Sequence, residues 1–204
     1  VDMEVALKDG AALVHEDFGT NETYTAKMPC GDYAAVAAKA DRLVKRRFIN
    51  QRLIPNPMEV RGAVGRYEPG TEEYTIWMSS QTPHIMRLLI TAFVLGIPEH
   101  KVRVISPDVG GAFGSKIFLY TEWVLVAWAS KRLGGRPVKW VESRRENYVG
   151  TIHGRDHITY IEVAAKKDGV VTGLKVKTYA NLGGRLSTIG PSSPSRKAYS
   201  MMSI

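Results

Sequence analysis

Alternating apolar and polar positions predict two β-hairpins in the chain. The first joins Val60–Tyr67 to Tyr74–Ser79 through a Pro69-Gly70 turn, because β-rich runs flank these two turn-forming residues. The second joins His157–Ala164 to Val170–Ala180 through a lysine-rich turn that ends in glycine. The pattern is also extended from Leu43 to Leu53, and the prolines at 55 and 57 end that extended segment.

Other segments follow the 3.6-residue period of a helix. A helix is predicted to begin at Pro83, where the missing proline N–H is not needed, and to end at Gly96. A second, largely apolar helix is predicted over 118–133. The remaining predictions are a short helix after the N-cap Asp32, another after the capping-box pair Ser143 and Glu146, and strands at Val102–Ile105 and Val138–Val141.

The predicted order is ββαβαβ, followed by a short helix and a hairpin. Such connectivity is typical of an α+β fold with a mixed β-sheet and helices on one face, and it disfavours a doubly wound nucleotide fold. Residues 1–30 have weak periodicity and many turn formers, so we interpret them as a connector from a preceding domain. Residues 31–204 are interpreted as the first part of one domain.

Composition narrows the class of protein. In 204 residues, 44% are hydrophobic and 24% are charged, which is ordinary for a folded globular chain. Cys30 is the single cysteine, so an intrachain disulfide or an iron–sulfur cluster built by this chain is excluded. The longest apolar stretch, 123–129, is too short to cross a membrane, and Val1–Lys8 lacks a signal-peptide core. We therefore expect a cytoplasmic protein without a membrane partner.

The formal net charge is +8. A basic surplus is compatible with nucleic acid, a phosphorylated cofactor or an acidic subunit as partner. The basic residues are scattered and carry no interleaved aromatic residues, which favours solvated faces over a nucleic-acid surface.

A glycine-rich segment between a predicted strand and a predicted helix is the first candidate for chemistry. Its members are Asp108, Val109, Gly110, Gly111, Ala112, Phe113, Gly114, Ser115 and Lys116. Glycines let a ligand approach the backbone closely, but the spacing matches neither the P-loop nor the dinucleotide fingerprint. Spacing alone leaves two interpretations open, a tight structural turn and a ligand cradle.

Gln81 lies at the second strand-to-helix junction, in Ser80-Gln81-Thr82-Pro83-His84. Its amide is either free to donate toward a ligand or merely solvated while Ser80 or Thr82 caps the helix. Glu59 follows a proline-fixed turn, where it is able to orient a loop, although a purely structural role is the simpler interpretation. The five histidines show no metal-ligand spacing.

Several of these segments together resemble a known family. Asn50–Glu59, Ser80–His84, Val104–Lys116 with its Gly-Gly-Ala-Phe-Gly core, and Arg136–Asp156 occur in the order found in the xanthine dehydrogenase and aldehyde oxidase family. The match is closest to the molybdenum-binding large subunit of the carbon monoxide dehydrogenase type. The resemblance implies a molybdenum–molybdopterin cofactor, in some members a cytosine dinucleotide, and hydroxylation of a small-molecule substrate. It also implies electron transfer to iron–sulfur and flavin subunits.

The resemblance assigns roles to particular residues. Gln81 matches the glutamine whose amide lies beside the oxo ligand of molybdenum, and Phe113 matches the residue whose backbone N–H approaches the metal. Gly110, Gly111, Ala112 and Gly114 would lie against the cofactor. These residues are cofactor-binding, Gln81 and Phe113 stand beside the metal without ligating it, and no catalytic residue is assigned.

Two departures from the family pattern qualify the resemblance. Purine-oxidising members carry a glutamate four residues after the loop phenylalanine, where this chain has Ile117, which argues against a purine substrate. The later family segments, including the one with the base glutamate, have no counterpart before Ile204. We therefore expect a fragment of a large subunit, working with the remainder of that subunit and inactive alone. The alternative is a non-catalytic basic module that docks nucleic acid or a partner protein.

Overall fold

The computed structural model describes residues 2–184, which fall into two compact units. The central unit is Leu53–Gly154, and the terminal unit combines Val1–Arg52 with Arg155–Ile204. Residues 185–204, the end of the expected domain, lie outside the described residues.

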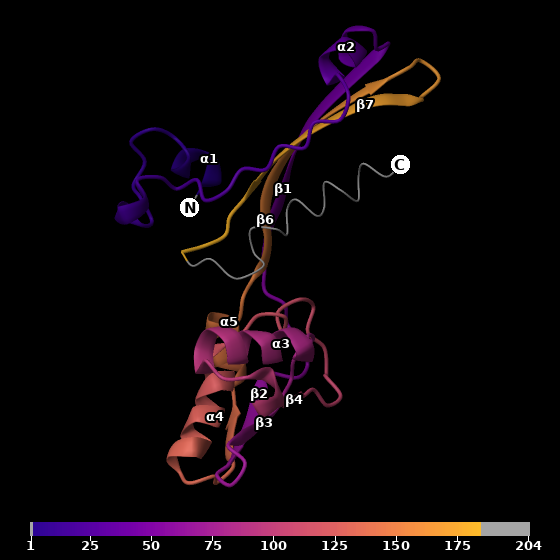
Figure 1. Ribbon diagram of the computed structural model, residues 1–204. Coiled ribbons are helices and arrows are strands. Elements are labelled where there is room, and N and C mark those ends of the chain that lie inside the picture. Colours follow the sequence, from indigo (N-terminus) through magenta and orange to yellow (C-terminus); the bar gives the residue numbers. More distant parts are fainter. Residues whose placement is uncertain (1, 185–204) are drawn as a thin grey trace. The chain divides into compact units, whose positions relative to one another are not determined.

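The central unit is built on a four-stranded sheet with the order β4-β3-β2-β5 (Figure 1). Its strands are β2 (Gly62–Glu68), β3 (Glu73–Met78), β4 (Val102–Ile105) and β5 (Val138–Val141). β2 is antiparallel to both β3 and β5, whereas β3 and β4 are parallel. The predicted mixed sheet and the predicted ββαβαβ order are confirmed.

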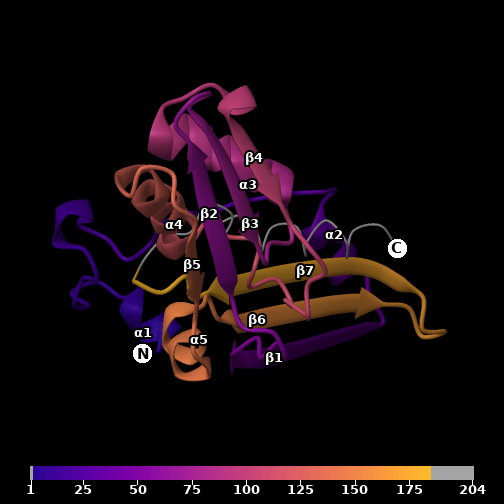
Figure 2. The ribbon, with the colours of Figure 1, turned by 90° about the horizontal axis from the view of Figure 1, so that it is seen from below.

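Two helices cover one face of this sheet, as Figure 2 shows for α3 (Pro83–Leu89) and α4 (Thr121–Arg132). Alternate residues of β2 and β3 point to that face and meet apolar residues of both helices. The buried core comprises Ala63, Tyr67, Tyr74, Ile76, Met78, Met86, Ile90, Val102, Tyr120, Trp123, Val126 and Ala127. The predicted placement of helices on one face is therefore confirmed.

Gly65 sets how closely α4 approaches the sheet. A Cβ atom at this position would lie 2.6 Å from the backbone nitrogen of Ala127 and 2.6 Å from the carbonyl carbon of Val126. Real side chains do not tolerate such distances, so the helix backbone rests directly on the glycine.

The helix that begins at Pro83 changes its geometry before it ends. After Leu89 it continues as a π-helical turn, η2 (Ile90–Leu95), and Gly96 ends it with a left-handed φ of 62°. The buried Thr91 hydroxyl donates to the carbonyl groups of Arg87 and Leu88 within this segment. A 3-10 turn, η3 (Glu99–Lys101), then leads into β4. The predicted helix bounds are thus correct, but its second half is not α-helical.

The remaining elements of the central unit agree with the sequence expectations. α5 (Arg144–Gly150) begins with the predicted capping box between Ser143 and Glu146. α4 begins at Thr121 rather than at 118, since residues before it belong to the loop after β4.

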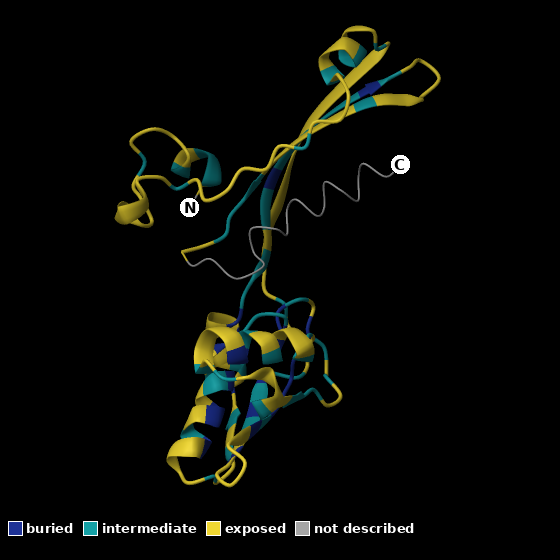
Figure 3. Cartoon of the chain, in the orientation of Figure 1, coloured by how far each residue is buried: buried dark blue, intermediate teal, exposed yellow. Residues whose placement is uncertain are grey.

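The terminal unit holds a separate three-stranded sheet of order β1-β6-β7. It consists of β1 (Arg42–Leu53), β6 (Gly154–Ala165) and β7 (Val171–Ala180), with α1 (Met3–Ala6), the 3-10 turn η1 (Glu16–Phe18) and α2 (Tyr33–Ala38). Asp32 caps α2 by accepting a hydrogen bond from the Ala35 N–H. Every residue of β1 is exposed, as the yellow ribbon in Figure 3 shows.

The pairing of β1 with β6 is the main difference from the sequence expectation. The extended segment and the second hairpin were both predicted, but not as one sheet apart from the ββαβαβ sheet. Periodicity marks a strand and its faces, whereas it does not encode which distant strand becomes its neighbour.

Candidate functional site

The two segments singled out in the sequence follow two neighbouring strands. Ser79–Thr82 comes directly after β3, and residues 106–120 come directly after β4. Because β3 and β4 are parallel and paired, their carboxyl ends lie at the same edge of the sheet. The fold therefore brings the Gln81 segment and the glycine loop together.

The backbone of Lys116 joins the two segments. The Gln81 N–H donates to the Lys116 carbonyl at 3.0 Å, and the Lys116 N–H donates to the Gln81 side-chain oxygen at 3.2 Å. The Ser80 hydroxyl donates to the same carbonyl at 3.4 Å. The amide oxygen of Gln81 is therefore engaged, while its amide NH₂ has no partner among the described residues.

The helix-capping alternative for this segment is not observed. Thr82 is the N-cap residue of α3, and its side chain makes no capping bond. The Ser80 hydroxyl oxygen accepts a hydrogen bond from the Thr82 N–H at 3.1 Å, which closes a turn before the helix and does not cap it. Ser106 anchors this turn by donating to the Ser80 carbonyl at 2.6 Å.

Phe113 has an unusual conformation at the tip of the glycine loop. Its φ is 51°, in the left-handed region, and its side chain is 77% exposed. Non-glycine residues in this region are uncommon and are held there by surrounding bonds. The Ala112 carbonyl accepts from the Ser115 N–H at 3.0 Å and from its hydroxyl at 2.8 Å, closing the turn around Phe113. No described residue accepts a hydrogen bond from the Phe113 N–H.

The three loop glycines are required for different reasons. A Cβ at Gly110 would lie 2.6 Å from the Cβ of Glu59, so only glycine fits. Gly111 has a φ of 92°, and its Cβ would lie 3.3 Å from Pro57. Gly114 has a φ of 89° and no heavy atom within 4 Å of an added Cβ, so its backbone faces open space.

Glu59 ties the two ends of this loop together. Its Oε2 atom accepts from the Gly110 N–H at 2.8 Å and from the Lys116 Nζ at 2.7 Å. Its backbone N–H donates to the Gly110 carbonyl at 3.0 Å. Of the two interpretations of Glu59 left by the sequence, these bonds favour the one in which it orients a loop over the purely structural role that was the simpler interpretation. The sequence analysis missed the buried ammonium of Lys116 and its pairing with Glu59, because the two residues lie 57 positions apart and no local pattern joins them.

A buried polar network around Tyr120 and Arg61 contacts the glycine loop at Ser115. The Tyr120 hydroxyl donates to the Ser115 carbonyl at 2.6 Å and accepts from the Ile152 N–H at 3.2 Å. The Arg61 guanidinium lies 3.7 Å from the centre of the Tyr120 ring and pairs with the buried Glu142 at 2.7 Å. Burial raises the pKa of Tyr120, because the phenolate would lose its hydration.

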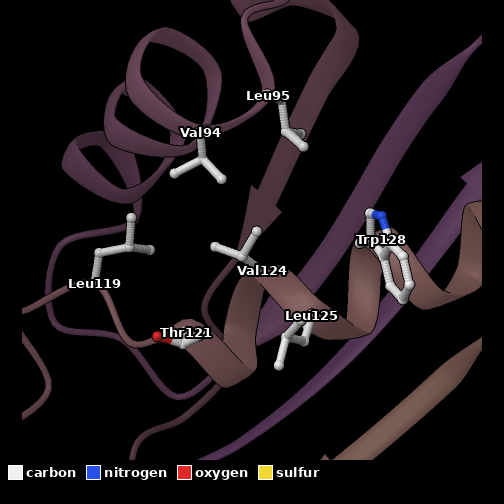
Figure 4. A pocket seen from close by; sticks show the side chains of 7 residues that line it. All are labelled: Val94, Leu95, Leu119, Thr121, Val124, Leu125 and Trp128. Carbon is white, nitrogen blue, oxygen red and sulfur yellow. The ribbon is translucent and has the colours of Figure 1, made fainter.

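An apolar groove lies elsewhere in the central unit, between η2 and α4 (Figure 4). It has a volume of about 430 Å³ and is lined by Val94, Leu95, Leu119, Thr121, Val124, Leu125 and Trp128. With one hydroxyl among apolar side chains, it offers little to an anionic ligand, and none of the predicted site residues lines it.

The described residues contain no cluster of three or more histidine, cysteine, aspartate or glutamate side chains suited to hold a metal ion. The polar groups that this site leaves without a protein partner among the described residues are hydrogen-bond donors, the Gln81 amide NH₂ and the Phe113 N–H.

Comparison with known proteins fits this kind of site. A family model described as the molybdopterin cofactor-binding domain matches residues 14–203. The chain belongs to this family. As a molybdopterin cofactor-binding domain, it carries its glycine loop and Gln81 within the matched residues.

Three related proteins illustrate the similarity. The chain is 38% identical over 192 residues to the carbon monoxide dehydrogenase large chain of Hydrogenophaga pseudoflava, covering 87% of this chain and 24% of that protein. It is also 38% identical over 154 residues to the nicotine 6-hydroxylase large subunit of Paenarthrobacter nicotinovorans, covering 76% of this chain and 18% of that protein. The solved structure of carbon monoxide dehydrogenase from Oligotropha carboxidovorans superposes on this chain with a TM-score of 0.75 at 34% identity. The match covers 88% of this chain and 24% of that one.

The chain thus spans between 18% and 24% of the length of these relatives. Two relatives at the same identity carry names with different substrates, carbon monoxide and nicotine. Membership of the family is therefore established, whereas similarity over this part of the protein does not separate one substrate from another. Among the described residues, no helix has the length and apolar character of a membrane span.

Proposed function

We propose that this chain supplies part of the molybdenum–molybdopterin site in the large subunit of a molybdenum-dependent oxidoreductase. The observation that carries the proposal is the pair of hydrogen-bond donors at one sheet edge, the Gln81 amide NH₂ and the Phe113 backbone N–H. Neither has a partner among the described residues, and Lys116 and the closed turn hold both in place.

The residues of the loop fit such a cofactor. When bound, the cofactor supplies a metal that exchanges electrons and transfers oxygen to a substrate. Preorganised donors such as the Gln81 amide and the Phe113 N–H stabilise negative charge on oxygen atoms beside them. Gly114 leaves its backbone open to a ligand, while Gly110 and Gly111 keep the loop close to Glu59 and Pro57. The carbonyl of Ala112 closes the turn by accepting from Ser115.

The remaining parts of the proposal concern the complete protein. Electrons would leave to iron–sulfur and flavin subunits. Within these 204 residues, the single cysteine Cys30 cannot hold an iron–sulfur cluster. A small-molecule substrate other than a purine is favoured by Ile117. The cytosine dinucleotide form, the cytoplasmic location, and the division into a connector 1–30 and a domain 31–204 stay predictions.

Metal analysis tests the proposal directly. The complete protein, purified from a host that makes the molybdenum cofactor, should contain close to one molybdenum per large subunit. The same protein from a cofactor-deficient host should contain none. Mass spectrometry of the released pterin then identifies its nucleotide. Absence of molybdenum from the first preparation would refute the proposed function.

The alternative, a basic module that docks nucleic acid or a partner protein, gains no support. Among residues 2–184, eight basic side chains form ion pairs with carboxylates, which reduces the charge available to phosphates.

A further inference from the structure

The Glu59–Lys116 ion pair has no assigned role in the proposed site. It joins Pro57–Glu59, the segment before β2, to the end of the glycine loop after β4. The Lys116 side chain is completely buried, whereas the Glu59 side chain is 37% exposed. A buried ammonium is costly unless it is paired, so the pair fixes where Lys116 lies.

One carboxylate oxygen serves both ends of the loop. Glu59 Oε2 accepts from the Gly110 N–H at 2.8 Å and from Lys116 Nζ at 2.7 Å. The missing Cβ of Gly110 makes this approach possible, because a methyl group there would lie 2.6 Å from the Glu59 Cβ. The loop that carries Phe113 is therefore closed at its base by a single side chain.

Lys116 passes this constraint on to Gln81. Its backbone N–H and carbonyl are the two groups that bond Gln81, at 3.2 Å and 3.0 Å. The side chain of Lys116 thus faces Glu59, while its backbone faces Gln81. A displacement of Lys116 would move the acceptor and the donor that orient the Gln81 amide.

We infer that the Glu59–Lys116 ion pair is a positioning device that sets the Gln81 amide and the Phe113 N–H relative to each other for cofactor binding. The inference rests on the proposed function. Neither side chain touches the ligand in this role; both act through the loop and through Gln81. Charge is needed as well as shape, since a neutral pair binds less strongly across the loop base.

The experiment uses Glu59→Gln, Lys116→Met and the double variant in the complete protein, from a host that makes the cofactor. Glu59→Gln keeps the size of the side chain and an acceptor oxygen, so this variant still tests the inference if Lys116→Met fails to fold. Glu99→Gln is the matched control, because Glu99 forms an exposed ion pair with Arg87 at 2.8 Å in the same unit. Hydrogen–deuterium exchange reports on loop order, and molybdenum content reports on binding.

We expect the amides of Gln81, Gly110 and Lys116 to exchange about tenfold faster in both single variants, while the β2–β3 hairpin keeps its protection. Molybdenum content at limiting cofactor should fall on the order of tenfold, as for other groups that orient ligand-binding residues. The double variant should be no worse than either single variant, because the pair acts as a unit. The control should match the unaltered protein.

Unchanged exchange in Glu59→Gln would overturn the inference, and so would faster exchange with undiminished molybdenum. Additive losses in the double variant would also overturn it, because the two residues would then act separately. Each of these results leaves the proposed function standing. Absence of molybdenum from the unaltered protein would instead refute the proposed function and this inference together.

Discussion

The side-chain oxygen of Gln81 accepts a hydrogen bond from the Lys116 backbone N–H, 3.2 Å away, and the Gln81 N–H donates to the Lys116 carbonyl. These two bonds decide which end of the amide faces outward, because only the oxygen is able to accept. The outward group is therefore a donor, which suits an oxygen atom on a ligand.

Gln81→Glu is expected to leave the fold intact and to impair the site. A carboxylate still accepts from the Lys116 N–H, but it has no NH₂ to offer and it carries a negative charge. The rate of substrate-dependent metal reduction in the complete enzyme should fall by roughly 10²–10³-fold, as for loss of one donor beside a developing oxyanion. Stopped-flow absorbance measures this rate.

Gln51, the other glutamine of the chain, supplies the control. It is exposed on β1, so Gln51→Glu introduces the same charge while the Gln81 amide is kept. An equal loss of rate in both variants would mean that the added charge, and not the lost donor, is responsible.

Gly111→Val is expected to abolish cofactor loading while much of the fold remains. The φ of 92° strains any side chain, on the order of 1–3 kcal/mol, and a Cβ would also meet Pro57 at 3.3 Å. Molybdenum content and the thermal unfolding midpoint are the measurements. Normal molybdenum content in this variant would rule out a cradle role for the loop.

Gly114→Ala separates backbone strain from close approach. Gly114 has a similar φ of 89°, but an added Cβ meets no protein atom within 4 Å. The Gly114→Ala variant should fold, with a loss of stability that comes from backbone strain alone. If it nevertheless loses more molybdenum than a variant with an equally stable fold, the ligand itself lies against Gly114.

Gly65→Ala is expected to destabilise the central unit. The methyl group would lie 2.6 Å from the Ala127 nitrogen, so α4 must move away from β2, at a cost of about 1–3 kcal/mol in the free energy of unfolding. Gly62→Ala in the same strand is the control, since its Cβ would make ordinary contacts of 3.5 Å and 3.6 Å. Urea unfolding of both variants should separate them; equal midpoints would contradict the packing argument.

Tyr120 should make the stability of the protein sensitive to alkaline pH. Burial raises the pKa of Tyr120 in the folded state, so between the unfolded pKa of about 10 and the higher folded pKa the unfolded chain releases a proton that the folded chain keeps. The free energy of unfolding is therefore unaffected by Tyr120 below pH 10 and falls as the pH rises through this window. Tyr120→Phe should show a shallower fall in urea unfolding between pH 9 and 11 (roughly the window of a tyrosine). Parallel curves would show that other groups dominate.

Much of the central unit follows from local sequence signals. Pro83 at a helix start, the Ser143–Glu146 capping box and the Pro69-Gly70 turn each act within a few residues, so their positions in the structure match the predictions. The pairing of β1 with β6 and the contact of Lys116 with Glu59 join distant segments. Such contacts depend on the completed fold, and local periodicity carries no information about them.

The candidate site likewise combines features that the sequence predicts with contacts that it does not. The residue types at Gln81 and Gly110–Gly114 were recognisable from the sequence, whereas the bonds that orient them come largely from backbone groups. The Lys116 N–H and carbonyl would be present with any amino acid other than proline at that position, so the residue type does not report them. The residue type matters instead for the Lys116 side chain, because its positive charge pairs with Glu59.

The π-helical turn Ile90–Leu95 has a consequence for how this helix tolerates changes in length. A π-turn holds one more residue than an α-turn, so it is equivalent to a single-residue insertion in a regular helix. Deleting one residue at the start of this turn would let the helix return to α geometry, and the residues after the deletion would keep their faces, because the π-turn had absorbed the extra residue. Val94 and Leu95 would then still line the groove with Leu125 and Trp128, so this turn is where the helix tolerates a change of one residue in length.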